Sequence, residues 1–235
     1  LRVGGVGCGR IFRWAHLNPY PRLAKKARLV GFYDLDAARA ELAREKYVKV
    51  LQDWATAHPE AAADVQANLA ELKVHRELDG LLAQVDLVDV CTTTRGRMPS
   101  AVAALGKGVH AMVEKPMART WTEADRAARA FKASGRVFCA LNDDNVYEPK
   151  YRVLHDLLRQ GAIGRVQSFW FIRGSPLDAK SVLKSQASAL ENGGGCLMDY
   201  GSHGLAACWY VLGLDKRIIR VDTASLDVLF PDRVL

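Results

Sequence analysis

The sequence lacks the features that mark several special classes of protein. In its 235 residues no apolar run approaches the roughly 18 residues of a membrane-spanning helix, and the most apolar stretch, residues 205–214, is too short. A charged segment followed by an apolar one is missing from the start, which predicts that the chain carries no secretion signal and works in the cytoplasm. The composition, 49% hydrophobic and 25% charged, is ordinary for a soluble globular protein.

Paired cysteines are also missing. None of the five cysteines forms a Cys-x-x-Cys motif, and an odd number cannot pair completely within one chain. Several lie within apolar runs; the full set is Cys8, Cys91, Cys139, Cys196 and Cys208. The pattern predicts reduced, mostly buried thiols in a cytosolic protein, and we expect no metal site.

Charge of one sign is not concentrated anywhere. The formal net charge is +7, but Lys and Arg alternate with Asp and Glu along predicted helices, as in residues 41–47 (ELAREKY) and 123–132 (EADRAARAFK). Such mixing is typical of solvated helix faces, whereas a nucleic-acid-binding surface would show a basic stripe. We therefore expect no nucleic-acid partner.

The most informative stretch is the first dozen residues, LRVGGVGCGRIF. A short apolar strand runs into glycines and then into a predicted helix, whose free N–H groups and positive dipole end face one spot. Gly7 and Gly9 permit a tight turn and a close-lying phosphate, so Gly7, Gly9, Arg10 and Ile11 are predicted to bind a dinucleotide. Phe12 stands where this fingerprint has a small third residue, and a Gly-rich turn without a ligand remains the alternative.

A second apolar run, residues 27–33, ends at Asp34. An acidic residue at the end of the second strand, about 20 residues beyond the glycines, can accept hydrogen bonds from the adenosine ribose hydroxyls. Its charge would repel a 2′-phosphate. The cofactor is therefore predicted to be NAD, with NADP disfavoured.

Further along, strands alternate with helices, which predicts an α/β fold with a doubly wound parallel sheet. Residues 48–72 look like an extra helical excursion at the domain edge. We expect later strands at residues 73–75, 87–92, 109–113 and 136–141, and helices at residues 10–26 (interrupted by Pro19 and Pro21), 36–47, 77–83, 99–107 and 120–134.

The rhythm changes after Asn142, which predicts one domain over residues 1–141 and a second over residues 142–235. For the second we expect helices at residues 149–160 and 193–212, strands at residues 166–173 and 218–229, and a polar loop at residues 174–192. This domain looks unfinished. Lys180 and Lys184 in the loop are consistent with attraction of an acidic substrate group or with ordinary solvated lysines.

Four separate motifs together resemble the Gfo/Idh/MocA family of nicotinamide-dependent oxidoreductases. They are GCGRI at residues 7–11, EKP at 114–116, GAIG at 161–164, and GGG at 193–195 followed by DYGSH at 199–203. The resemblance covers essentially the whole chain. It implies a Rossmann domain followed by an α+β domain with a mostly antiparallel open sheet, here incomplete, which takes part in homo-oligomer formation as a dimer or tetramer.

The resemblance also implies site residues. The family's catalytic lysine falls on Lys115, and its Asp and His partners fall on Asp199 and His203. Thr92 and Glu114, each at the end of a predicted strand, are expected beside the cofactor. A departure from the family pattern at Ala206 leaves the substrate class open, as do departures at Thr93, Thr94 and Arg97.

The chemistry of these residue types suits oxidation of a secondary alcohol. A histidine such as His203 can take the hydroxyl proton, and the Lys115 ammonium can stabilise the developing alkoxide. Asp199 and His203 are four residues apart, so in one continuous helix they share a face. The sequence thus predicts an NAD-dependent dehydrogenase or reductase for a sugar, polyol or related cyclic alcohol. An NAD-dependent glycosidase and a catalytically silent NAD-binding regulator remain alternatives.

Overall fold

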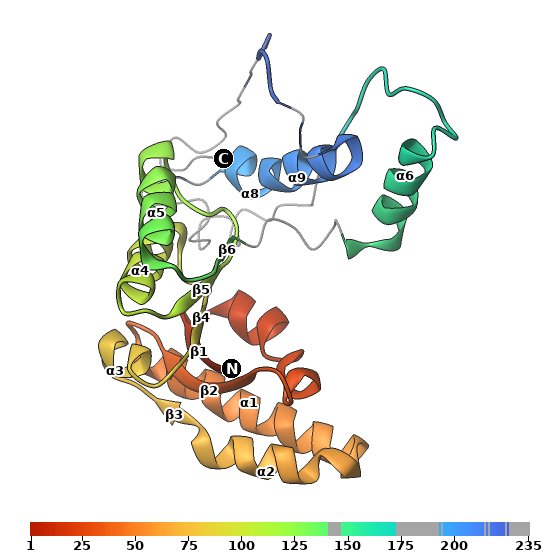
Figure 1. Cartoon of the computed structure of the whole chain (residues 1–235). Helices are drawn as coiled ribbons and strands as arrows, with labels where there is room; N and C mark the ends of the chain where they lie inside the picture. The colour runs from red at the N-terminus through yellow and green to blue at the C-terminus, as the bar shows by residue number, and fades with distance from the viewer. Residues whose placement is uncertain are drawn as a thin grey trace. The chain divides into compact units, whose positions relative to one another are not determined.

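The computed structural model describes residues 1–140, 147–172, 193, 195–213, 215, 217–223 and 225 (Figure 1). The chain divides into two compact units. Unit 1 comprises Leu1–Glu114 and Trp121–Ala140, and unit 2 comprises Lys115–Thr120 and Leu141–Leu235.

Unit 1 is built on a six-stranded sheet with the strand order β3-β2-β1-β4-β5-β6, and every neighbouring pair is parallel. This is the strand order of a dinucleotide-binding Rossmann fold. In such a sheet the strands are added outward from β1 to β3 on one side and from β4 to β6 on the other, so the strand order reverses between β1 and β4. The strands are β1 (Arg2–Val6), β2 (Arg28–Tyr33), β3 (Lys73–Val74), β4 (Leu87–Val90), β5 (His110–Val113) and β6 (Phe138–Ala140).

The sheet is covered by helices, so its central strands are buried along nearly their whole length, as parallel strands require. The helices of unit 1 are α1 (Ala37–Ala57), α2 (Ala62–Glu71), α3 (Leu78–Leu82), α4 (Thr94–Gly106) and α5 (Trp121–Ser134), with 3₁₀ turns η2 (Tyr20–Leu23) and η3 (Pro59–Ala61). α1 packs beside α2, and α4 packs beside α5 (Figure 1).

The core of unit 1 contains a line of aromatic rings between the sheet and α1. The ring centroids of Phe12 and Phe32 lie 6.3 Å apart, and those of Phe32 and Tyr47 lie 6.1 Å apart. All three side chains are fully buried. Removing such large apolar side chains from water is a main source of the stability of a domain core.

The helix predicted over residues 36–47 is correct in its start and wrong in its end. The Asp36 side chain accepts a hydrogen bond from the N–H of Ala38 at 3.1 Å and caps α1, as expected. α1 then continues to Ala57, so the first part of the predicted excursion is the same helix. The rest is anchored to the core, since the buried Asn68 of α2 bonds both the Tyr47 hydroxyl (3.1 Å) and the Leu29 carbonyl (2.8 Å).

The helix predicted over residues 10–26 is replaced by two short pieces. Phe12–His16 is a π-helix, η1, in which the N–H of Leu17 donates to the carbonyl of Phe12 at 3.1 Å. A 3₁₀ turn follows at Tyr20–Leu23, because Pro19 and Pro21 lack the N–H groups that an α-helix would need. The π-helix was not predicted, since no sequence pattern distinguishes it from an α-turn.

Three further boundaries differ from the prediction. β4 ends at Val90 rather than at Thr92, and α4 begins at Thr94 rather than at Pro99. Pro99 therefore lies inside α4 and does not start it. Strand β6 covers Phe138–Ala140, shorter than the predicted 136–141.

Unit 2 consists, in its described part, of helices α6 (Pro149–Arg159), α8 (Cys196–Asp199) and α9 (Gly201–Leu212). The strand predicted over residues 166–173 is wrong for residues 166–172, which run without regular structure, and the same holds for residues 218–223. A strand forms only where a neighbour pairs its backbone, and the described residues of unit 2 offer these segments none. Lys180 and Lys184 lie outside the described residues.

Four of the cysteines, Cys8, Cys91, Cys139 and Cys208, are free thiols, as predicted. Cys8 and Cys91 are buried, Cys208 is partly buried and Cys139 is exposed, so the prediction of burial is right for two of the four. Within the ranges that the structure describes, no helix is both long and apolar enough to cross a membrane.

Candidate active site

The turn after β1 has the backbone geometry that the sequence predicts for a phosphate-binding loop. Gly7 has a φ of +84°, which L side chains rarely adopt, and its N–H donates to the Tyr33 carbonyl at 2.9 Å. A Cβ on Gly7 would lie 2.5 Å from the Thr92 amide nitrogen. Glycine is therefore required where the ends of β1 and β4 meet, at the reversal point of the sheet.

Gly9 differs from Gly7, because a Cβ there would meet no atom within 4 Å. The space beside it is open, as a loop that admits a ligand needs. Arg10 is exposed and Ile11 is partly buried against the core. The Arg10 side chain therefore faces solvent, and Ile11 fastens the loop to the domain.

Phe12 stands where the dinucleotide fingerprint has a small third residue. Its ring lies against Gly5 of β1, which has no side chain. A Cβ on Gly5 of β1 would lie 2.2 Å from the Phe12 ring carbon Cζ. The helix and the strand therefore approach closely, with the glycine on the strand instead of the helix. The signal in the sequence is the Gly4-Gly5 pair of the first strand, where the glycine on the strand makes room for the Phe12 ring.

Asp34 lies at the end of β2, where the ribose is expected. One carboxylate oxygen accepts from the N–H of Cys8 at 2.7 Å, and the other accepts from the N–H of Asp36 at 2.9 Å. These bonds hold the carboxylate against the glycine turn. Burial and the nearby Asp34 charge raise the pKa of the Cys8 thiol to about 12, so this cysteine is inert.

Glu114 and Thr92 lie at the ends of β5 and β4, where ligands bind in open parallel sheets. The N–H of Glu114 donates to the Val90 carbonyl at 3.0 Å and continues the pairing of these strands. The Thr92 hydroxyl donates to the Thr93 carbonyl at 3.1 Å. Both residues are therefore at the edge of the sheet that the sequence predicts for the cofactor.

The structure adds a buried polar group that the sequence analysis missed, which we name the His16 cluster: His16, Tyr20, Asp89, Cys91 and Glu114. His16 Nδ1 lies 3.0 Å from Asp89 Oδ2, and His16 Nε2 lies 3.2 Å from Glu114 Oε1. The Tyr20 hydroxyl donates to Asp89 Oδ2 at 2.9 Å, and Cys91 Sγ lies 3.4 Å from His16 Nδ1. Asp89 in an otherwise apolar strand was the available signal, because a buried carboxylate needs partners.

In unit 2, Lys115 and Asp199 form an ion pair, although they are far apart in the sequence. Lys115 Nζ contacts Asp199 Oδ1 and also donates to the Asp199 carbonyl at 3.3 Å. The side chain of Lys115 is 21% exposed and that of Asp199 is 41% exposed. The structure therefore joins two of the three residues predicted to be catalytic, and leaves them open to solvent. The Lys115–Pro116 peptide bond is cis.

His203 lies on a different helix from Asp199, which corrects the prediction of one continuous helix from Gly193. α8 ends at Asp199, Tyr200 forms a turn, and α9 begins at Gly201. Gly193 and Gly195 both have positive φ and precede α8. His203 is buried on α9, with its ring centroid 6.4 Å from that of Tyr200.

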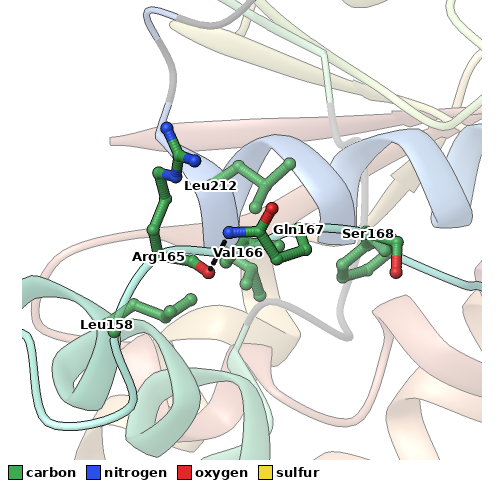
Figure 2. A pocket seen from close by; sticks show the side chains of 9 residues that line it. Leu158, Arg165, Val166, Gln167, Ser168 and Leu212 are labelled. Carbon is green, nitrogen blue, oxygen red and sulfur yellow. Dashed lines mark hydrogen bonds between the residues drawn. The ribbon is translucent and has the colours of Figure 1, made fainter.

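A cavity of about 410 Å³ lies elsewhere in unit 2, between α6, residues 164–169 and the end of α9. Figure 2 shows the side chains that line it, including Gln167, whose Nε2 donates to the Arg165 carbonyl at 3.4 Å. Among the described residues its lining includes Leu158 and Leu212 but not Lys115, Asp199 or His203. The cavity is thus separate from the predicted catalytic residues.

Comparison with known proteins identifies the family. The profile described as "Oxidoreductase family, NAD-binding Rossmann fold" (GFO_IDH_MocA) matches residues 1–141, and that of the GFO/IDH/MocA C-terminal domain matches residues 151–232. Relatives include inositol 2-dehydrogenase 4 of Saccharopolyspora erythraea, 28% identical over 70% of this chain and 43% of the relative. D-glucoside 3-dehydrogenase of Escherichia coli is 27% identical over 91% of this chain and 54% of the relative.

Among solved structures, the WlbA dehydrogenase of Bordetella pertussis, in complex with NADH and UDP-GlcNAcA, has a TM-score of 0.67 at 22% identity. The match covers 91% of this chain and 60% of that one, and at this identity it shows the fold alone. This chain spans about half the length of the curated relatives it matches. It belongs to the Gfo/Idh/MocA family of oxidoreductases, with the NAD-binding Rossmann fold of that family in its first 141 residues.

Proposed function

We propose that this chain supplies the cofactor-binding and catalytic residues of an NAD-dependent dehydrogenase or reductase. The reaction moves a hydride between NAD(H) and a secondary alcohol or ketone of a sugar, polyol or related cyclic substrate. The observation that carries the proposal is the Lys115–Asp199 ion pair. Strand β5 ends at Val113, Glu114 follows it, and Lys115 comes next. Relatives named as inositol and D-glucoside dehydrogenases support the substrate class.

The residues of unit 1 fit NAD. The Gly7 turn brings backbone close to the ligand position, and the open space beside Gly9 leaves room for a pyrophosphate. The Asp34 carboxylate, already held by the Cys8 N–H, has acceptor capacity left for the ribose hydroxyls. When bound, NAD⁺ supplies the acceptor for the hydride. We place Arg10, Ile11, Thr92 and Glu114 beside it as further cofactor-binding residues.

On the substrate side, each catalytic residue has a distinct role in alcohol oxidation. His203 takes the hydroxyl proton as the carbon loses its hydride. The Lys115 ammonium faces the oxygen and stabilises its developing negative charge. Asp199 orients the Lys115 ammonium through the ion pair, and it can accept a hydrogen bond from a second substrate hydroxyl because it is partly exposed. In the reducing direction His203 returns the proton.

Variants of these residues test the roles. We expect His203→Ala and Lys115→Ala to lower kcat by roughly 10²–10⁴-fold while leaving NAD affinity nearly unchanged, because proton transfer and charge stabilisation act in the transition state. Asp199→Asn should have a smaller effect, since the amide still accepts a hydrogen bond. The matched control is His155→Ala, which removes a histidine that stacks on Tyr210 in the same unit. Near-normal kcat in His203→Ala would show that this histidine is structural.

A substrate screen on the full-length protein decides between reaction classes. We expect NADH absorbance to rise with polyols, aldoses or glycosides. Release of free sugar with no net change in NADH would indicate the glycosidase alternative. Binding of NAD without turnover of any of these would indicate the regulatory alternative.

We also propose that the protein works in the cytoplasm and forms homo-oligomers through its C-terminal part. The free thiols of Cys8, Cys91 and Cys139 support a reducing compartment. The C-terminal-domain match over residues 151–232 supports an oligomerising second domain. Light scattering of the full-length protein measures the assembly directly, and a monomer at working concentration would contradict it.

A further inference from the structure

The His16 cluster lies in unit 1, and the roles assigned above to cofactor and substrate residues use only Glu114 from it. His16 comes from η1, Asp89 from β4 and Glu114 from the end of β5. The side chains of His16 and Asp89 are 10% and 1% exposed, and that of Glu114 is 15% exposed. A histidine thus ties the first helical segment to the ends of two neighbouring strands, away from bulk water.

The geometry fixes the protonation of His16. Both ring nitrogens lie within hydrogen-bond distance of a carboxylate oxygen, and an ionised carboxylate can only accept. With both carboxylates ionised, both nitrogens donate, which is the imidazolium form. Burial opposes this charge, but the hydrogen bonds and charges of Asp89 and Glu114 outweigh it and raise the pKa of His16 to about 10.

Ligand-type atoms of His16, Asp89 and Cys91 also lie within 4.8 Å of one another, as in a metal site. A metal would need a neutral imidazole and a thiolate. In the structure the imidazole instead bridges two carboxylates, and burial together with the Asp89 charge raises the pKa of the Cys91 thiol well above its usual range. A metal would have to displace the protons of both groups, and the contacts present are those of a hydrogen-bonded network.

The backbone around His16 is specialised in a way that points to a role. η1 is a π-helix, a rare conformation that is frequently found at functional sites. His16 is the last residue of this π-helix, and its ring contacts Asp89 and Glu114 from there. On the other side of the contact, Glu114 is fixed twice, by its N–H to the Val90 carbonyl and by its carboxylate to His16.

We propose that His16 is a positioning residue, which bridges Asp89 and Glu114 and thereby fixes the chain direction at the start of the Lys115 segment. The inference rests on the proposed function, in which Lys115 faces the reacting oxygen. Glu114 and Lys115 share a peptide bond, so a Glu114 held at two points restrains the orientation of that peptide. Small misplacements of a catalytic group far from a mutation can cost about 10²-fold in rate.

The test compares His16→Gln with the matched control His58→Gln, which removes a histidine of the same unit that stacks on Trp54. We expect His16→Gln to lower kcat by about 10²-fold, with KM and NAD affinity within about threefold of the parent. His58→Gln should match the parent in all three. A His16→Gln/Glu114→Gln double variant should lose no more than the worse single variant, because the two side chains act as a unit.

A second readout does not depend on activity. Reductive ¹³C-methylation of the lysines gives an NMR signal for Lys115, assigned with Lys115→Arg. We expect this signal to shift in His16→Gln and not in His58→Gln. An unmoved signal, or a kcat loss matched by an equal loss of folded protein, would overturn the inference. If the parent protein turns over no substrate, the proposed function fails, and the NMR comparison still decides the role of His16.

Discussion

The two polar groups of this protein, the His16 cluster in unit 1 and the Lys115–Asp199 pair in unit 2, differ most in their exposure. The Asp89 side chain is 1% exposed, and that of Asp199 is 41% exposed. A buried carboxylate must keep all of its partners, because none can be replaced by water. A half-exposed carboxylate can exchange a partner for water or for a substrate hydroxyl at little cost. Burial therefore suits the first group to holding a geometry and exposure suits the second to meeting a substrate.

The same contrast explains why each group has the partners it has. Asp89 receives bonds from Tyr20, His16 and Cys91, which come from three different segments of unit 1. Burial and the Asp89 charge raise the pKa of Tyr20 well above its usual range, so its hydroxyl stays a donor. The Asp199 carboxylate is bonded by the ammonium of one long side chain, Lys115. A single, partly exposed partner suits the proposed role, in which the carboxylate also meets a substrate hydroxyl.

The largest expected effect is a difference in the loss of folding stability when each of the two carboxylates, Asp89 and Asp199, is removed. Asp89→Ala leaves the His16 imidazolium and the Tyr20 hydroxyl without their buried acceptor, and breaking such a pair costs about 3–5 kcal/mol. Asp199→Ala removes a partly exposed pair, which is worth about 1 kcal/mol or less. Urea unfolding of both variants measures the difference. Equal losses would show that exposure does not separate the two groups.

The contrast was only half visible in the sequence. The Gly7 turn could be predicted from the spacing of its glycines. Lys115 and Asp199 followed from the resemblance to the family's motifs, and their catalytic role stays a prediction. Asp89 could be flagged as a carboxylate in an apolar strand, but its partner could not. His16 reaches it through a π-turn, and that backbone form has no sequence signature distinct from an α-helix.

A similar limit applies to the fold. The parallel sheet followed from alternating apolar runs, because buried strands are nearly continuous in hydrophobicity. The predicted strands over residues 166–173 and 218–229 failed in their described parts because pairing is a tertiary property, which local alternation does not supply. The length of α1 was missed because no Gly or Pro stops it before Pro59.

A smaller effect is the pH dependence of the free energy of unfolding, which we expect the His16 cluster to cause. The pKa of His16 is raised from 6.5 to about 10 in the folded protein, so its contribution to stability is complete below pH 6.5 and is lost as the pH rises through about 10. We expect the free energy of unfolding to fall by on the order of 2–4 kcal/mol over this range. His16→Gln should lack this component.

Urea unfolding at several pH values between 6.5 and 10 makes the measurement, with His58→Gln as the control for other groups that titrate there. The difference in stability between the parent and His16→Gln should shrink as the pH rises. A difference that stays constant with pH would mean that His16 is neutral in the folded state, and the ion network would then be wrong.

The smallest expected effect concerns Asp34, which is partly buried like Asp199 but is held by backbone groups. The N–H groups of Cys8 and Asp36 donate to its carboxylate. Water screens part of its charge, so its repulsion of a 2′-phosphate is worth about 1 kcal/mol. Asp34→Asn keeps one acceptor for a ribose hydroxyl and removes the charge. We expect it to narrow the preference for NADH over NADPH by about five- to tenfold, measured by fluorescence titration of both cofactors. Asp53→Asn, on the exposed side of α1, removes an equal charge in the same unit and should leave the ratio unchanged. If the parent binds NADPH as tightly as NADH, the Asp34 carboxylate does not select the cofactor, and its two backbone bonds are then its whole role.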